Sequence, residues 1–254
     1  MRIAIALGAL TLAACSAPPE EVVAELARAL EARDSEAALA LVHPDYADPR
    51  GDRAALAADL RALPEAFSRI RLDYQDLSTV EGASAREVTA TGTLDAELVG
   101  DTTWRVVGPA QLELLRDDGF KVRAGLLPHL RDIRDLMRRR QAALEANDAE
   151  ALRPLLHPRY RDGDADLQET MARLARDLVG APVRLRVTNY RLELRGPTAH
   201  LDEHYVLTVA GQTLPPRIAR FTLAPSAGRW RILAGLYPEV GTTSPTLEYR
   251  PRSN

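Results

Sequence analysis

The stretch "ALEARDSEAALALVHPDY" at residues 29–46 recurs as "ALEANDAEALRPLLHPRY" at residues 143–160. A second pair closes the repeat, since "GFKVRAGLLP" at 119–128 is matched by "RWRILAGLYP" at 229–238. A repeat of this length corresponds to a whole domain and not to one unit of a solenoid. The sequence therefore predicts two tandem copies of one domain.

Each copy is predicted to begin with three helices. Apolar residues at helical spacing mark the first helix, and Asp34 and Asp148 then open a short second helix as N-terminal caps. Pro44 and Pro158 disfavour helical geometry in the residue before them, so this helix ends there. The third helix is expected from about residue 52 to 63 and from about residue 165 to 179.

Strands follow the helices. In "REVTATGTLDAEL" at 86–98 and "AHLDEHYVLTV" at 199–209, apolar and polar residues alternate, which is typical of a strand with one wet face. Two more strands are expected in each copy, around 104–115 with 120–126 and around 214–223 with 230–236. Helices followed by antiparallel strands predict the α+β class, with the sheet folded over the helices.

Both repeated segments resemble the opening of the nuclear transport factor 2-like superfamily, which includes SnoaL-like proteins and ketosteroid isomerases. The resemblance covers nearly all of both copies. It implies two tandem cone-shaped domains, each with about three N-terminal helices packed on a curved antiparallel sheet around a pocket. It also implies that the halves are joined through a sheet, as an internal pseudo-dimer. The expected domains are 20–127 and 128–240, followed by a C-terminal tail at 241–254.

The amino terminus, "MRIAIALGALTLAAC", has the pattern of a secretory signal: Arg2, an apolar run at 3–12, two small residues and Cys15. The apolar run is too short to cross a bilayer as a helix. Residues 12–15 resemble the lipobox of bacterial lipoproteins, whose cysteine is acylated and becomes the first residue of the mature chain. The resemblance implies a signal peptide at 1–14, lipidation of Cys15 and a short tether at 15–19. An ordinary export signal that is cut nearby remains the alternative.

The expected location is the bacterial cell envelope. A serine after the lipobox cysteine, here Ser16, favours the outer membrane in the resembled Gram-negative lipoproteins, so the protein is expected to face the periplasm. Cys15 is the only cysteine, which excludes an intramolecular disulfide. The acylated Cys15 would make the membrane a partner.

Composition indicates a globular body, with 46% apolar and 27% charged residues. A net charge of −3 provides no field that would attract nucleic acid, so no nucleic-acid partner is expected. The densest basic run, "RDIRDLMRRR" at 131–140, carries apolar residues at helical spacing. Its arginines are therefore predicted to form the solvated face of a helix.

The two histidines of the repeated motif, His43 and His157, are interpreted as structural. Each is expected to bind free carbonyl groups at a helix end, while Tyr46 or Tyr160 covers the core edge with its ring and keeps its hydroxyl in water. No nucleophile or orienting carboxylate beside the histidine is repeated in both copies, which disfavours catalysis.

A second histidine pair, His200 and His204, has the spacing of a helical metal site but lies in a predicted strand. Four residues of strand span about 13 Å, which is too far for both rings to bind one zinc ion. No metal site and no cofactor are predicted.

The resemblance implies Asp48 and Asp162 as candidate catalytic residues, because isomerases of the superfamily place a general base just after this aromatic segment. A carboxylate in an apolar cone can have a raised pKa and accept a proton. The position of the family's oxyanion-stabilising tyrosine, however, falls near Leu26 or Arg140, and that of its second acid near Gln111 or Ala219. Since the oxyanion donors are missing, a turn or cap role is favoured.

Glu203 interrupts the apolar face of its strand. A buried carboxylate needs a partner or a proton. Glu203 either belongs to a ligand pocket or reaches water at the open edge of the sheet, and both alternatives stay open. The candidate ligand-binding residues are Tyr160, Tyr190, Glu203, Tyr205 and Trp230.

The sequence favours a lipid-anchored, non-catalytic envelope module that binds a small apolar ligand or assembles with an envelope protein. One alternative is an isomerase- or dehydratase-like enzyme that uses Asp48 or Asp162. The other is a purely structural subunit whose cones are filled by their own side chains.

Overall fold

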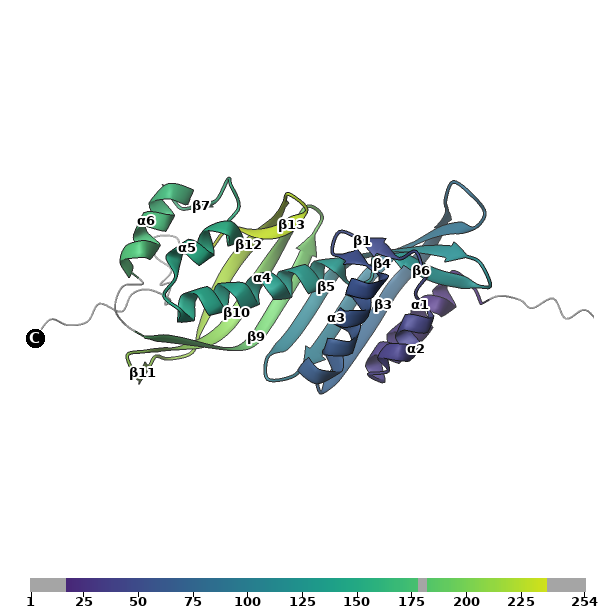
Figure 1. Ribbon diagram of the computed structural model, residues 1–254, viewed down its shortest axis with the longest axis horizontal. Coiled ribbons are helices and arrows are strands. Elements are labelled where there is room, and N and C mark those ends of the chain that lie inside the picture. The colour runs from purple at the N-terminus through teal and green to yellow at the C-terminus, as the bar shows by residue number, and fades with distance from the viewer. Residues whose placement is uncertain (1–16, 178–181, 237–254) are drawn as a thin grey trace, which may run out of the picture.

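The computed structural model describes residues 17–177 and 182–236, so Cys15, the signal segment and the predicted tail lie outside the described residues. Helices lie along one side of a continuous sheet (Figure 1). The predicted α+β class is confirmed. None of the helices in the described part of the chain is long and apolar enough to cross a membrane.

The two halves have closely matching element orders. The first half contains α1 (Pro19–Glu31), α2 (Ser35–Ala40), β1 (Ala47–Asp48), β2 (Gly51–Asp52), α3 (Arg53–Ala66), β3 (Arg69–Glu81), β4 (Glu87–Val99), β5 (Thr103–Arg116) and β6 (Phe120–Ala124). The second contains α4 (Pro128–Glu145), α5 (Ala149–Leu152), η1 (Arg153–Leu155), β7 (Arg161–Asp162), β8 (Ala165–Asp166), α6 (Leu167–Asp177), β9 (Val183–Arg195), β10 (Thr198–Val209), β11 (Gln212–Thr213), β12 (Arg217–Ser226) and β13 (Arg229–Ala234).

Local sequence explains where several elements begin. The carboxylates of Asp34 and Asp148 accept hydrogen bonds of 2.9 Å from the third residue of α2 and α5, which confirms both predicted caps. Helix α6 begins later than expected because Ala165 and Asp166 first pair with β7. Strand β12 also begins late, directly after "PP" at 215–216, since proline has no N–H to donate to a ladder.

The two halves share one nine-stranded sheet, with β13-β12-β10-β9-β5-β4-β3 in order, β6 on β5 and β11 on β10. Neighbouring strands are antiparallel except β5 and β9, which pair in parallel from Thr103 with Asn189 to Val107 with Glu193. Strand β6 covers only Glu113–Arg116 of β5, which leaves the start of β5 open for β9.

The joint between the halves is made by their sheets. The halves meet strand edge to strand edge, and their buried apolar residues form one cluster. The physical reason is that an open edge presents unpaired N–H and C=O groups, which the other half satisfies.

The repeated histidine motif attaches the helical layer to the sheet in the same way in both halves. The backbone N–H of His43 donates to Val122 O at 2.9 Å, and that of His157 donates to Ile232 O at 2.8 Å. Each ring Nδ1 accepts a backbone N–H two residues on, at 3.0 Å. The prediction that these rings bind helix-end carbonyls is wrong for His43, because its Nε2 instead lies 2.7 Å from the Asp117 carboxylate.

The motif tyrosines are buried, and the prediction that their hydroxyls stay in water is wrong. The Tyr46 hydroxyl donates to Asp48 at 2.6 Å and accepts from the backbone N–H of Leu126 at 3.2 Å. We call this arrangement the tyrosine clasp. The second half repeats it with Tyr160, Asp162 at 2.9 Å and the Leu236 N–H at 3.2 Å.

A third repeated contact holds the first helix of each half to its sheet. Glu31 at the end of α1 accepts the Leu72 N–H of β3 at 2.9 Å, and Glu145 at the end of α4 accepts the Leu185 N–H of β9 at 3.0 Å. These carboxylates satisfy backbone donors of the two strands. The repeated "ALEA" segments therefore encode contacts between helix and sheet.

We expect Tyr46→Phe to lower the free energy of unfolding by about 1–3 kcal/mol, because it leaves a buried carboxylate and a backbone N–H without their hydroxyl partner. Urea denaturation followed by circular dichroism measures this. Tyr74→Phe is the matched control, since no hydrogen bond to the Tyr74 hydroxyl is found within the described residues, and it should change stability by less than about 0.5 kcal/mol. Equal effects of the two substitutions would contradict a role for the clasp.

Candidate functional site

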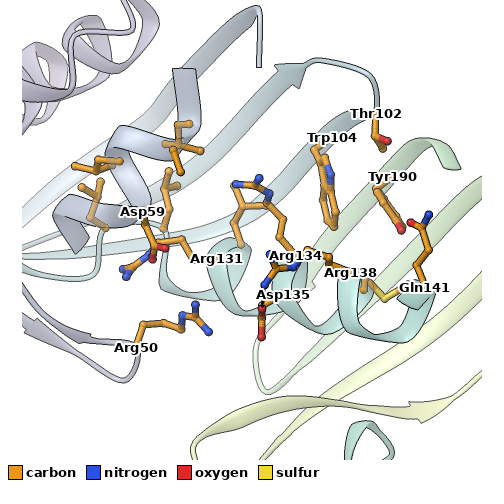
Figure 2. A pocket seen from close by; sticks show the side chains of 17 residues that line it. Arg50, Asp59, Thr102, Trp104, Arg131, Arg134, Asp135, Arg138, Gln141 and Tyr190 are labelled. Atoms are coloured by element: carbon orange, nitrogen blue, oxygen red, sulfur yellow. Dashed lines mark hydrogen bonds and ion pairs between the residues drawn. The ribbon is translucent and has the colours of Figure 1, made fainter. Parts of the chain in front are cut away.

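A cavity of about 360 Å³ lies between the two halves, lined by α3, α4 and the adjoining strands β5 and β9. Figure 2 shows the arginines of α4 along one side and Trp104 and Tyr190 on the opposite side. Leu60 and Leu63 of α3 and Leu130 of α4 add apolar walls. The cavity therefore combines an apolar surface with several positive charges.

Trp104 and Tyr190 are neighbours because β5 and β9 pair in parallel at these two residues. Their ring centroids are 4.1 Å apart, and the ring planes are inclined by 31°. The Tyr190 hydroxyl donates to Glu203 Oε2 at 3.0 Å. Burial, with the Glu203 charge beside it, raises the pKa of Tyr190 well above its usual range, so the hydroxyl stays protonated.

Glu203 is fully buried and pairs with Arg140 of α4, whose Nη1 donates to both carboxylate oxygens at 3.0 and 2.9 Å. The Arg140 guanidinium also lies 4.6 Å above the Phe221 ring. The alternative in which Glu203 reaches water at the sheet edge is thereby excluded. The pair therefore lies buried inside the second half, between α4 and β10.

The prediction that the arginines of 131–140 form a solvated face is wrong for Arg131 and Arg140, which are buried. Each faces a carboxylate from another element: Arg131 Nη1 lies 2.9 Å from Asp48 and its Nε pairs with Asp59. Only Arg138 and Arg139 of this run are exposed. Buried arginines are retained here because each has a partner.

Asp48 lies in the tyrosine clasp and is already fully engaged. Besides Tyr46 and Arg131, it accepts the backbone N–H groups of Arg50 at 2.7 Å and Gly51 at 3.1 Å. These four donors occupy both carboxylate oxygens of Asp48. Asp162 is also buried, on β7, and accepts the Tyr160 hydroxyl. Neither aspartate lines the cavity.

Arg134 differs from its neighbours on α4. It is half-buried, and its guanidinium lies 4.6 Å above the Phe67 ring. Burial lowers the pKa of Arg134, although the side chain remains charged at neutral pH. Within 17–177 and 182–236, no carboxylate lies at ion-pairing distance from it and no hydrogen-bond acceptor is found.

The remaining predicted ligand residues do not gather at this cavity. Of the five, only Tyr190 lines it. Trp230 donates its indole N–H to His129 at 3.1 Å and its backbone N–H to Asp132 at 2.6 Å. Tyr205 is buried in the second half, and Tyr160 belongs to its clasp.

The histidines of β10 lie on its polar face, where His200 is exposed and His204 half-buried. Across the described ranges, no group of three or more His, Cys, Asp or Glu side chains is placed to hold a metal ion.

Sequence reasoning missed Trp104 and Arg134. Arg134 lies at helical spacing from the buried residues Leu130 and Met137 of α4. This spacing in the sequence indicated that Arg134 faces the same side of the helix as they do. Trp104 gave no comparable signal, because its place in the cavity depends on the contact between β5 and β9.

No protein-family model matches this chain, and no curated protein matches it. Among solved structures, a proposed aromatic ring hydroxylase from Novosphingobium aromaticivorans shares 15% identity with a TM-score of 0.39, covering 42% of this chain and 90% of that protein. A proposed dehydratase of the NTF2-like family from Streptomyces avermitilis shares 13% identity with a TM-score of 0.37, covering 42% and 91%. An NTF2-like protein from Cytophaga hutchinsonii shares 18% identity with a TM-score of 0.34, covering 41% and 91%.

We expect Glu203→Gln to lower the free energy of unfolding by roughly 3–5 kcal/mol, because it leaves the Arg140 charge buried without a countercharge. Denaturation in guanidinium chloride measures the loss. The matched control is Glu193→Gln in the exposed pair with Arg195, which should leave the stability nearly unchanged because water screens this pair.

The double substitution Arg140→Met with Glu203→Leu tests whether the unpaired charge causes the loss of stability. It removes both charges together and should recover most of the stability that Glu203→Gln loses. A double variant that is no more stable than the single variant would show that the buried charge is not the cause of the loss.

Proposed function

We propose that this protein is a lipid-anchored, non-catalytic module of the bacterial cell envelope that binds a small ligand in the cavity between its halves. The observation that carries the proposal is the cavity itself, whose volume of about 360 Å³ and largely apolar walls suit a small molecule. Arginines at its margin supply polar groups that can orient a ligand.

Anchoring is proposed from the amino-terminal sequence, where Cys15 follows an apolar run and two small residues. Helix α1 begins at Pro19, four residues after this cysteine. A tether of that length spans about 14 Å at most. An acylated Cys15 would therefore hold the folded body close to the membrane surface.

The non-catalytic part of the proposal is supported by the state of the two candidate aspartates. A base of the isomerase type needs a free carboxylate in the ligand cavity and donors for the developing oxyanion. Asp48 is held by four donors, and both Asp48 and Asp162 lie outside the cavity walls.

A purely structural role is less well supported. Arg140 and Glu203 do pair with each other inside the second half, as such a role requires. The cavity between the halves is not filled, however, and a second cavity of about 290 Å³ lies over the first-half sheet beside Leu94 and Val106.

We expect Cys15→Ala to abolish labelling of the protein by radioactive palmitate and to release it from the membrane fraction. Ser16→Asp is the matched control, because it keeps the cysteine: labelling should persist while the protein moves from the outer to the inner membrane fraction. Persistent labelling of Cys15→Ala would refute lipidation at this residue.

Native mass spectrometry of the full chain, purified from its own host in mild detergent, should show a retained small molecule. Ala62→Trp should remove it, because Ala62 is an exposed residue of α3 at the cavity wall and a bulky side chain there narrows the cavity. Arg61→Trp is the control on the same helix, since Arg61 does not line the cavity. Retention of the molecule by Ala62→Trp would place the ligand elsewhere.

A further inference from the structure

The charges around the cavity are almost completely paired. Arg50 pairs with Asp132 at 3.0 Å and Arg138 with Asp135 at 2.9 Å. Arg131 is shared between Asp48 and Asp59. Among the arginines that line the cavity, only Arg134 has no carboxylate at ion-pairing distance in the part of the chain that the structure describes.

The position of Arg134 makes this lack of a partner costly. Its guanidinium is half-buried over the Phe67 ring, where a cation–π contact replaces only part of the lost hydration. A guanidinium carries five N–H donors and suits a carboxylate or a related acid group. An anionic group in the cavity would satisfy these donors.

The rest of the wall limits what can be attached to that anionic group. Leu63, Leu126, Leu130 and Met137 line the cavity together with Trp104, so the body of the ligand must be largely apolar. Asp59 and Asp135 also border the cavity, but each is already paired with an arginine, Asp59 with Arg131 and Asp135 with Arg138. Within the described residues, Arg134 is thus the one unpaired cation at the wall, which favours a single negative charge on the ligand.

We propose that the ligand is a small organic monoanion with an apolar body, and that Arg134 binds its acid group. This inference rests on the proposed function, because it names the chemical class that the cavity between the halves selects. The acid group lies at α4, and the apolar body fills the space between Trp104 and the leucines of α3.

Two fluorescent probes that share one aromatic body test the charge requirement. The full-length protein is titrated with 8-anilinonaphthalene-1-sulfonate, which is a monoanion, and with N-phenyl-1-naphthylamine, which lacks the sulfonate. Since a hydrogen bond to a charged group contributes a factor of roughly ten to one hundred in affinity, the sulfonate probe should bind at least about tenfold more tightly. Equal affinities of the two probes for the cavity would overturn the inference.

Arg134→Gln should weaken the sulfonate probe by roughly tenfold or more and leave the neutral probe unchanged. Arg139→Gln is the matched control, because it removes the same charge from an exposed position on the same helix and does not line the cavity. Arg134→Lys keeps a positive charge and should recover part of the affinity. If Arg134→Gln and Arg139→Gln weaken the sulfonate probe equally, Arg134 is not the binding group.

Quenching of tryptophan fluorescence by the bound probe shows whether the probe lies in the cavity. The chain has two tryptophans, and only Trp104 lines the cavity. Bound probe should quench the emission of the wild type strongly, and Trp104→Phe should remove most of that quenching while Trp230 remains as the reference.

The outcomes separate this inference from the proposed function. Suppose that both probes bind beside Trp104 with equal affinity and that Ala62→Trp abolishes their binding. The cavity is then a ligand site, and only the inference that its ligand is a monoanion fails. If neither probe binds beside Trp104 and native mass spectrometry shows no retained molecule, the proposed function fails as well.

Discussion

The parallel pairing of β5 with β9 is the interaction on which the rest of the molecule depends. It converts two sheets into one and satisfies the edge groups that β6 leaves uncovered. It also places Trp104 beside Tyr190 and brings α4 of the second half alongside α3 of the first (Figure 1). The cavity exists only because the halves are joined at this edge.

The sequence predicted the helices and most strands of each half, because those signals are local, but it missed β3 and β9. Helix caps at Asp34 and Asp148 depend on contacts three residues away, and the alternation along β4 and β10 follows from the two-residue period of a strand. The tyrosine hydroxyls were misplaced because their partners at Leu126 and Leu236 lie about eighty residues farther along the chain.

The candidate site could be predicted only in part. Glu203 was identified as unusual, but its partner Arg140 lay in a run whose apolar spacing assigned all its arginines to the solvated face of a helix. Arginine in phase with buried leucines indicates a buried charge only when an acid from another element faces it, and the facing acid is set by tertiary contacts. Tyr190 was named as a candidate although its strand β9 was not predicted, whereas Trp104 became part of the site through the joint between the halves.

The joint between β5 and β9 also raises the question of why the corresponding edge of the second half does not pair with a further strand. In the first half, β5 pairs with β9 over 103–107. This stretch begins ten residues before the part of β5 that pairs with β6. In the second half, β12 begins to pair with β13 at Thr222, so the equivalent stretch is 212–216. This stretch ends in Pro215 and Pro216. Two consecutive prolines offer no N–H for another strand. Another strand therefore cannot pair there as β9 pairs with β5, and this lack of donors opposes a head-to-tail contact that repeats into a fibre.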